Sequence, residues 1–132
     1  MDMRRLAAIP LFSTLPEADL AAVAAVANEL EIGEEDTLTT EDEFGHCLFA
    51  IGAGTAEVIR DGATLRMVGA GEMIGEVAVL TSGRRTATIV ATTPLRPVSL
   101  FKRDVWTLER DAPEAARRRH ELLATRTIAA AP

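Results

Sequence analysis

The pattern of hydrophobic and polar positions changes twice along this chain, and its first section is typical of a helix. Residues 16–28, with the sequence PEADLAAVAAVAN, are rich in alanine and carry acidic side chains in the first turn. A helix over this range places Leu20, Val23 and Ala27 on one face. Pro16 suits the first helical position, because the N–H that proline lacks would have no partner there. We therefore predict an amphipathic helix over residues 16–28.

Short runs of β-type residues occupy the middle of the chain. They are separated by glycine or acidic turns and recur about every ten residues, which favours an antiparallel sandwich or jelly roll over alternating βα units. The dipeptide Asp61-Gly62 lies between two of the runs and is a strong hairpin signal, because both residues tolerate positive φ. The runs are DTLTT, HCLFAI, TAEVIR, TLRMV, TATIVAT and PVSLF.

The last section of the chain returns to a helical pattern. The segment FKRDVWTLERD places Val105, Trp106 and Leu108 where one helical face can pack on the strands. Pro113 then predicts the start of a second helix, through EAARRRHELLATRTIA. The cluster Arg117-Arg118-Arg119-His120 within it points around such a helix, so we interpret it as solvated surface in preference to a partner site.

Composition and charge exclude several classes of protein. The chain has 132 residues, no tyrosine and 4% aromatic residues, so its core must be aliphatic. A net charge of −6 disfavours wrapping of duplex nucleic acid but leaves room for a small anion in a local basic pocket. One cysteine and two histidines give little material for a disulfide or a metal site, and we expect His46 and Cys47 to be edge and core residues of a strand.

The start of the chain, MDMRRLAAIPLF, is too short an apolar run for a membrane helix and is interrupted by Pro10. We interpret it as a folded edge of the domain. No stretch approaches the length of a membrane span, so we expect a cytoplasmic protein without a membrane segment.

The chemistry concentrates in residues 74–88, IGEVAVLTSGRRTAT. The run EVAVL can form a single helical turn that begins just after Gly75. The first amides of such a turn lack partners inside the helix, and glycine lets a phosphate approach the backbone closely. Arg85 follows on the next strand, where a guanidinium can hold two phosphate oxygens. Together these features predict a small anion site.

Glu76 adds a second function to this site. A carboxylate repels phosphate, so beside an anion site it is best used as an acceptor for a hydroxyl, such as that of a sugar. This combination indicates a nucleotide whose phosphate and sugar lie side by side. The alternative is that Arg85 is an ordinary surface arginine and Glu76 its salt-bridge partner.

The segment resembles the phosphate-binding cassette of cyclic nucleotide-binding domains, which occur in bacterial catabolite activators, cyclic-nucleotide-dependent kinases and cyclic-nucleotide-gated channels. The resemblance extends over roughly residues 10–128 and includes the opening LF..LPEADL and the segment HCLFAIGAGTAEV. LTSGRRTAT is especially similar to the channel branch and its bacterial relatives. The cassette positions are filled by Gly75, Glu76, Val77, Ala78, Val79, Leu80, Arg85, Thr86, Ala87 and Thr88.

This resemblance implies a fold and a division of the chain. The implied fold is mainly β: an eight-stranded antiparallel jelly-roll β-barrel with an N-terminal helix, a short cassette helix and two C-terminal helices. We expect a single domain over residues 1–132, with an N-terminal helical part at 1–30. The β-barrel with its cassette would span 31–101, and the C-terminal hinge and lid helices would span 102–130.

The resemblance also implies roles for individual residues. Arg85 would pair with the exocyclic oxygens of the cyclic phosphate, and Glu76 would accept the ribose 2′-hydroxyl. The phosphate would also meet backbone groups of the cassette, at Gly75, Val77, Ala78 and Ala87.

The purine and the lid involve a second set of positions. The resemblance implies that Ile74, Val58 and Val68 form the apolar wall against the base. Thr86 matches a threonine that accompanies cyclic GMP binding in several branches without excluding cyclic AMP. On the last helix, Arg126 matches the arginine that caps the base, flanked by Leu122 and Leu123 as lid residues; an exposed arginine near a helix end can also be merely solvated.

Two positions depart from the family pattern. Asp42 stands where many relatives have a turn glycine, at a small expected cost because aspartate tolerates such conformations. Arg84 replaces the usual proline before the phosphate arginine. Its charge could attract phosphate or point to solvent, and we favour solvent.

The leading functional hypothesis is a regulatory sensor without catalysis. It would bind cyclic AMP, with cyclic GMP as a second ligand, and would act on an effector absent from this chain through its C-terminal helix. No helix-turn-helix follows that helix, so we expect no direct contact with nucleic acid. One alternative is a degenerate fold that serves as a ligand-free interaction module. Another is a cupin-type enzyme, which two unpaired histidines disfavour.

Overall fold

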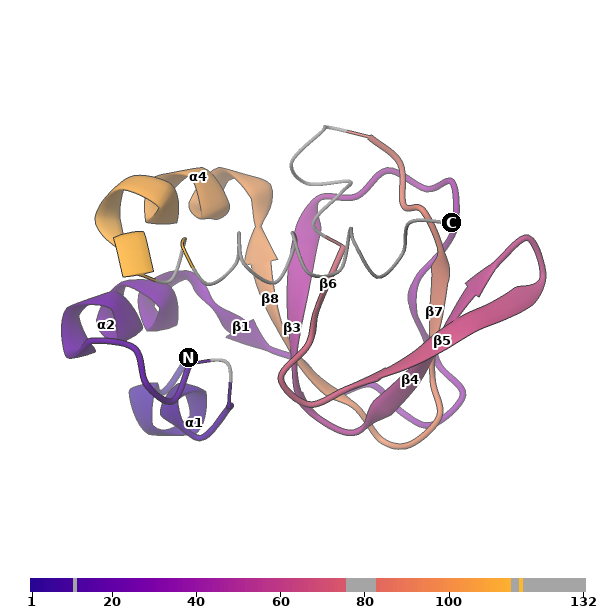
Figure 1. Ribbon diagram of the computed structural model, residues 1–132, viewed down its shortest axis with the longest axis horizontal. Helices are drawn as coiled ribbons and strands as arrows, with labels where there is room; N and C mark the ends of the chain where they lie inside the picture. Colours follow the sequence, from indigo (N-terminus) through magenta and orange to yellow (C-terminus); the bar gives the residue numbers. More distant parts are fainter. Residues whose placement is uncertain (11, 76–82, 115–116, 118–132) are drawn as a thin grey trace.

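The computed structural model describes residues 1–10, 12–75, 83–114 and 117. Within these residues, the helices α1 and α2 precede the strands, and α4 follows them (Figure 1). In chain order the elements are α1 (Met3–Ala7), α2 (Glu17–Val26), β1 (Asn28–Glu29), β2 (Thr37–Thr39), β3 (Cys47–Ala53), β4 (Thr55–Arg60), β5 (Ala63–Gly69), β6 (Met73–Ile74), β7 (Thr88–Ala91), β8 (Arg96–Phe101) and α4 (Lys102–Asp111).

The strands form two four-stranded sheets, in the orders β1-β8-β3-β6 and β2-β7-β4-β5. Every strand pair in the described part of the chain is antiparallel. The mainly β, antiparallel prediction with eight strands is therefore confirmed. The sheets face each other as in a sandwich and, among the described strands, are not joined into one closed hydrogen-bonded barrel, which corrects that part of the expectation.

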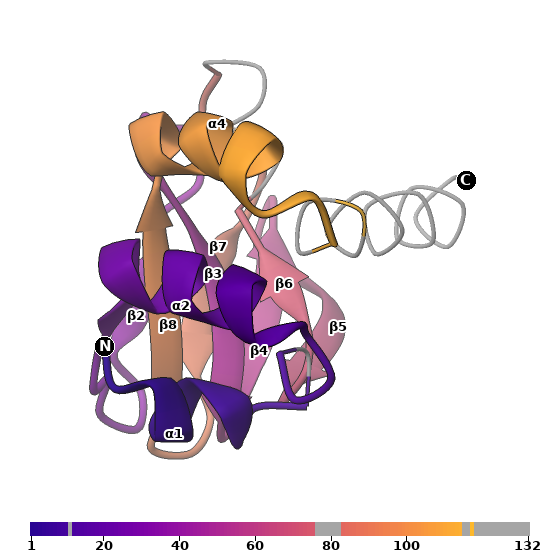
Figure 2. The same ribbon diagram turned by 90° about the vertical axis from the view of Figure 1, so that its left-hand side faces the viewer.

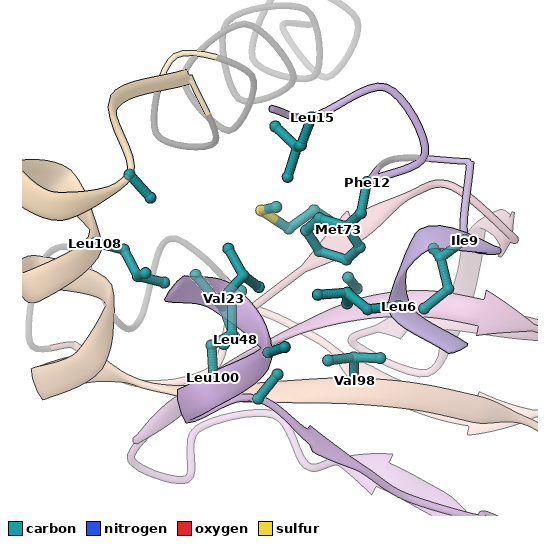
Figure 3. Packing of buried hydrophobic residues seen from close by; sticks show 14 of the residues in the cluster. Leu6, Ile9, Phe12, Leu15, Val23, Leu48, Met73, Val98, Leu100 and Leu108 are labelled. Atoms are coloured by element: carbon teal, nitrogen blue, oxygen red, sulfur yellow. The ribbon is translucent and has the colours of Figure 1, made fainter. Parts of the chain in front are cut away.

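The β1-β8-β3-β6 sheet is covered on both faces. In β3, Leu48, Phe49, Ala50 and Ile51 are all buried, as expected for a strand with a neighbouring layer on each side. Figure 2 shows α1, α2 and α4 in front of this sheet. Their side chains converge on it in a helical cluster (Figure 3), made of Leu6, Ile9, Phe12, Leu15, Val23, Ala24, Ala27, Leu48, Ala50, Met73, Val98, Leu100, Val105, Leu108 and Ala112.

The β2-β7-β4-β5 sheet has one buried face. Along β7 the burial alternates, with Ile89 and Ala91 buried and their neighbours half-buried. The inward side chains of this sheet meet those of the other sheet in an interior cluster. It consists of Phe49, Ile51, Ala56, Val58, Val68, Ile74, Ala87, Ile89, Ala91 and Leu95.

Most predicted elements appear near their expected bounds. The helix predicted over 16–28 is α2, and Pro16 caps it instead of occupying its first turn. Val23 and Ala27 are buried as expected, whereas Leu20 is only partly covered. The Asp61-Gly62 hairpin is confirmed, since both residues have positive φ, 52° and 77°.

Three elements were not predicted from the sequence. One is α1, in the segment interpreted only as a folded edge: the Asp2 side chain accepts a hydrogen bond from the Arg4 amide at 2.6 Å, and Leu6 is fully buried. The other two are the two-residue strands β1 and β6, which are too short for a periodic pattern. Both of these strands lie at sheet edges.

The helix predicted from Lys102 is α4, with Val105 and Leu108 buried in the helical cluster. The Trp106 side chain, the expected cassette helix and nearly all of the last helix lie outside the described residues.

Candidate functional site

The site forms where the two sheets meet. Gly75 directly follows β6, at the edge of one sheet, and Arg85 lies just before β7 in the other. Nη1 of Arg85 donates a hydrogen bond to the Gly75 carbonyl oxygen at 3.2 Å. Arg85 is buried, with 9% of its surface exposed, and its guanidinium carbon lies 5.4 Å from the centre of the Phe49 ring. This is not the environment of an ordinary surface arginine.

Gly75 is required by the local geometry. Its φ of +84° lies in the region that favours glycine. A Cβ at this position would also overlap Nη1 of Arg85 and approach the Cys47 carbonyl oxygen to 3.2 Å. The backbone at Gly75 and the arginine guanidinium are therefore packed against each other as one unit.

The backbone of Arg85 is held by main-chain hydrogen bonds to residues 41–43, Glu-Asp-Glu, which we call the acidic loop. The Arg85 amide donates to the Glu43 carbonyl oxygen at 2.7 Å, and the Asp42 amide donates to the Arg85 carbonyl oxygen at 3.0 Å. Asp42 has φ of 70°, in agreement with its place at the family's turn glycine. The loop thus positions Arg85 through main-chain contacts, while the Arg85 side chain faces Gly75.

Arg84 takes a different direction from its neighbour. It is exposed, its guanidinium carbon lies 4.5 Å from the centre of the Phe44 ring, and Nη1 donates to the Asp42 carbonyl oxygen at 2.8 Å. Arg84 therefore faces the outer side of the acidic loop, as the solvent interpretation predicted. Its contacts hold that loop in place.

The predicted apolar wall lies in the interior cluster. Ile74 and Val68 are 2% exposed and Val58 is 9% exposed; Ala87, which was predicted to meet the phosphate, is 7% exposed in the same cluster. Thr86, between Arg85 and Ala87, is exposed, and its carbonyl oxygen accepts a hydrogen bond from Nε of Arg60 at 2.9 Å. The three residues of the predicted wall thus share the interior cluster with Phe49, whose ring lies beside the Arg85 guanidinium.

Sequence reasoning missed Arg66. Arg66 pairs with Val58 across β4 and β5, and Val68 is two residues further on, so all three side chains lie on one face of the sheet. Nη1 of Arg66 donates to Glu72 at 2.9 Å, and both side chains are 40% exposed. The register of the hairpin is the signal that places this charge beside the apolar wall.

The pKa of Cys47 is affected by its burial and by the charge of Arg85. Cys47 is half-buried at the start of β3. Burial raises the pKa of its thiol, and the positive charge of Arg85 offsets part of that rise.

The remaining predicted site residues lie outside the described residues. They are Glu76, Val77, Ala78, Leu122, Leu123 and Arg126. Within the described ranges, no cluster of three histidine, cysteine or acidic side chains is arranged to hold a metal ion. None of the described helices is long and apolar enough to cross a bilayer.

Fold and site together define a two-sheet domain with a buried arginine beside a glycine backbone, a combination suited to an anion. The family model of the cyclic nucleotide-binding domain matches residues 29–111, more than half of the chain. The chain belongs to this family, whose relatives use the domain for regulation.

Individual relatives agree with this assignment. The chain is 30% identical over 84 residues to the cAMP-dependent protein kinase regulatory subunit of Yarrowia lipolytica, covering 64% of this chain and 22% of that protein. It is 37% identical over 70 residues to the cGMP-dependent protein kinase egl-4 of Caenorhabditis briggsae, covering 53% and 8%. The chain thus spans less than a quarter of either protein.

Among solved structures, the catabolite activator protein of Thermus thermophilus matches with a TM-score of 0.80 at 27% identity. The match covers 92% of this chain and 59% of that one.

Proposed function

We propose that this chain is a regulatory sensor domain that binds a cyclic nucleotide, with cyclic AMP as the favoured ligand. The observation that carries the proposal is the buried Arg85 guanidinium packed against the Gly75 carbonyl, at the junction of the two sheets. Burial strengthens a contact between a guanidinium and a phosphate, because less water screens the two charges. Arg85 would hold the exocyclic phosphate oxygens.

Backbone groups complete the proposed phosphate site. We place the phosphate against the main chain of Gly75, Val77, Ala78 and Ala87. Glu76, the neighbour of Gly75, would accept the ribose 2′-hydroxyl, which a 3′,5′-cyclic phosphate leaves free. The base would then lie against Ile74, Val58 and Val68, which are apolar side chains of the interior cluster.

Cyclic AMP is favoured because bacterial members of the family mostly respond to it. The Yarrowia lipolytica relative, a regulatory subunit of a cAMP-dependent kinase, agrees with this choice. Cyclic GMP is the second candidate, and the position of Arg66 is the observation that favours it. Guanine offers two acceptors, N7 and O6, to an arginine, whereas adenine offers one acceptor and a donor. Thr86 would add a contact to the guanine amino group.

Transmission of the signal would involve the C-terminal part of the chain. Arg126, Leu122 and Leu123 would close over the base, and the helix that carries them would bias an effector through its greater affinity for one state. We assign residues 1–30, 31–101 and 102–130 to the helical part, the strands with the cassette, and the hinge with the lid. The chain would work in the cytoplasm without catalysis of its own and without touching nucleic acid.

The experiment is a calorimetric titration of the chain with cyclic AMP and with cyclic GMP. We expect Arg85→Ala to lower the affinity by roughly thirty to a thousandfold, the loss of a charge-assisted phosphate contact. Arg84→Ala is the matched control: it removes the neighbouring arginine, which faces the acidic loop, and should change the affinity only severalfold. No heat with either nucleotide, from a folded chain, would favour the ligand-free interaction module.

The same titration decides the role of Arg66. Arg66→Leu should lower the affinity ratio of cyclic GMP to cyclic AMP by about tenfold, if Arg66 reads the guanine edge. Arg96→Leu, which removes an exposed arginine on β8, should leave the ratio unchanged. An unchanged ratio in the Arg66 variant would leave cyclic AMP as the ligand with no guanine-reading arginine.

A further inference from the structure

The helical layer contains a buried charge that the proposed ligand site does not use. Among the described residues, the buried charged side chains are Arg85 and Asp19. Asp19 lies on α2 with 7% of its surface exposed. Burial of a carboxylate is costly unless hydrogen bonds stabilise it, so the contacts of Asp19 indicate what the charge does.

One contact of Asp19 links α2 to the segment that follows α4. Its Oδ2 accepts a hydrogen bond from the Glu114 amide at 2.9 Å, across 95 positions of sequence. Glu114 follows a break: α4 ends at Asp111, and Ala112 has φ of −137° and ψ of 68°. The chain is helical again at Pro113 and Glu114.

The break leaves a helix start without a cap of its own. The first amides of a helix need acceptors, which the residue before the helix usually supplies from its side chain. Ala112 occupies that position, is fully buried and has no side-chain acceptor. Asp19 supplies the acceptor from another helix, so the position of the Glu114 amide depends on α2.

The helix α2 is in turn tied to the N-terminus. The terminal ammonium of Met1 donates to the Ala24 carbonyl oxygen at 2.9 Å and to that of Ala27 at 3.3 Å. Leu6 and Val23 share the helical cluster, so α1 and α2 pack as one layer (Figure 3). A displacement at Glu114 would therefore reach both N-terminal helices.

We propose that Asp19 is a positioning residue that fixes the start of the C-terminal segment, at residues 113–114, to α2. Through this contact, movement of that segment is delivered to the α1–α2 layer. The second statement rests on the proposed function, because it takes cyclic nucleotide binding as the source of the movement. The N-terminal helices are then a second output of the domain, besides the C-terminal helix.

The contact itself is tested without ligand, by amide hydrogen exchange measured by NMR on the whole chain. In Asp19→Ala we expect the Glu114 amide to exchange at least about tenfold faster than in the wild type, because its acceptor is gone. Asp19→Asn keeps an acceptor oxygen and should restore slow exchange. Glu17→Ala removes an exposed acid from the same first turn and is the matched control. Unchanged exchange at Glu114 in Asp19→Ala would overturn the proposal.

The transmission is tested with saturating cyclic AMP on the same variants. In the wild type and in Asp19→Asn, we expect the amide shifts of α2 to change together with those of Ile74 and Ala87. In Asp19→Ala the shifts of Ile74 and Ala87 should still change, whereas those of α2 should not. An α2 response that persists in Asp19→Ala refutes transmission through this contact. If the wild type binds no nucleotide, the proposed function fails, and the exchange experiment alone decides the role of Asp19.

Discussion

The two sheets of this domain are buried in different ways. The β1-β8-β3-β6 sheet lies between the helices and the other sheet, so β3 sends Leu48 and Ala50 into the helical cluster and Phe49 and Ile51 into the interior cluster. The β2-β7-β4-β5 sheet contributes only its inner face to a core. The first sheet is thus shared by two cores, and the second serves one.

This difference explains where the site can form. A sheet buried on both faces has no surface left for a ligand, except at its edge and at the ends of its strands. Gly75 follows the edge strand β6 of that sheet, and Arg85 enters the sheet with one free face. The hydrogen bond between Arg85 and Gly75 therefore links the two sheets at the end of β6 and just before the start of β7.

The largest expected effect on affinity comes from adding a side chain at Gly75, where the two sheets are linked. Gly75→Ala should weaken cyclic nucleotide binding by roughly thirty to a thousandfold, because the new Cβ overlaps the Arg85 guanidinium and displaces its phosphate contact of about 2 to 4 kcal/mol. Calorimetric titration measures the affinity, and thermal unfolding shows whether the fold survives.

Gly71→Ala is the control for backbone strain. Gly71 has φ of +88°, close to that of Gly75, but a Cβ there would meet only the Pro10 side chain at 3.8 Å. Both variants should lose stability, and only Gly75→Ala should lose binding beyond that. Equal losses of affinity in the two variants would show that Gly75 matters for its backbone angle alone.

A second experiment separates the two cores. Val98 is fully buried in the helical cluster, and Val58 lies in the interior cluster beside the proposed base site. Val98→Ala should lower the free energy of unfolding by about 2 to 3 kcal/mol and leave the affinity nearly unchanged. Val58→Ala should cost less stability and more affinity, since one of its neighbours would be the purine. Denaturant unfolding and titration of both variants check this, and a loss of affinity in Val98→Ala alone would reverse the assignment.

The smallest expected effect is a pH dependence of the free energy of unfolding, caused by the Cys47 thiol. Because the pKa of the Cys47 thiol is raised in the folded state, the unfolded chain releases this proton first. The contribution to stability is therefore complete below about pH 8.5, the ordinary thiol pKa, and is lost as the pH rises through the folded value. Cys47→Ser should lack this loss in denaturant unfolding followed from pH 7 to 10.

Arg85 gives this prediction a second test. Since its positive charge lowers the thiol pKa, Arg85→Ala should raise that pKa further and slow alkylation of Cys47 at a fixed alkaline pH. Faster alkylation in the variant would mean that Arg85 acts on Cys47 by covering it and not by its charge.

The sequence predicted the elements that have a repeating pattern or a specific turn. The alternating run TAEVIR coincides with β4, and Asp61-Gly62 forms the hairpin to β5. The helix α1 was not predicted because its five residues make little more than one turn, and the strands β1 and β6 were not predicted because two residues show no alternation. The sequence also predicted the anion site at Gly75 and Arg85. Glycine allows a close approach of the backbone, and arginine can hold two phosphate oxygens.

What the tertiary structure alone decided is how distant residues combine. As a sequence feature, Asp19 is an acid in the first turn of a helix, and only the packing of α2 places it at the Glu114 amide. In the sequence, Arg66 is simply a charged residue within a predicted strand, and only the β4–β5 register shows that it lies opposite Val58. Local sequence fixes backbone preference and side-chain chemistry, since these depend on near neighbours. Which charge is buried, and against which partner, depends on contacts between distant segments that only the folded chain brings together.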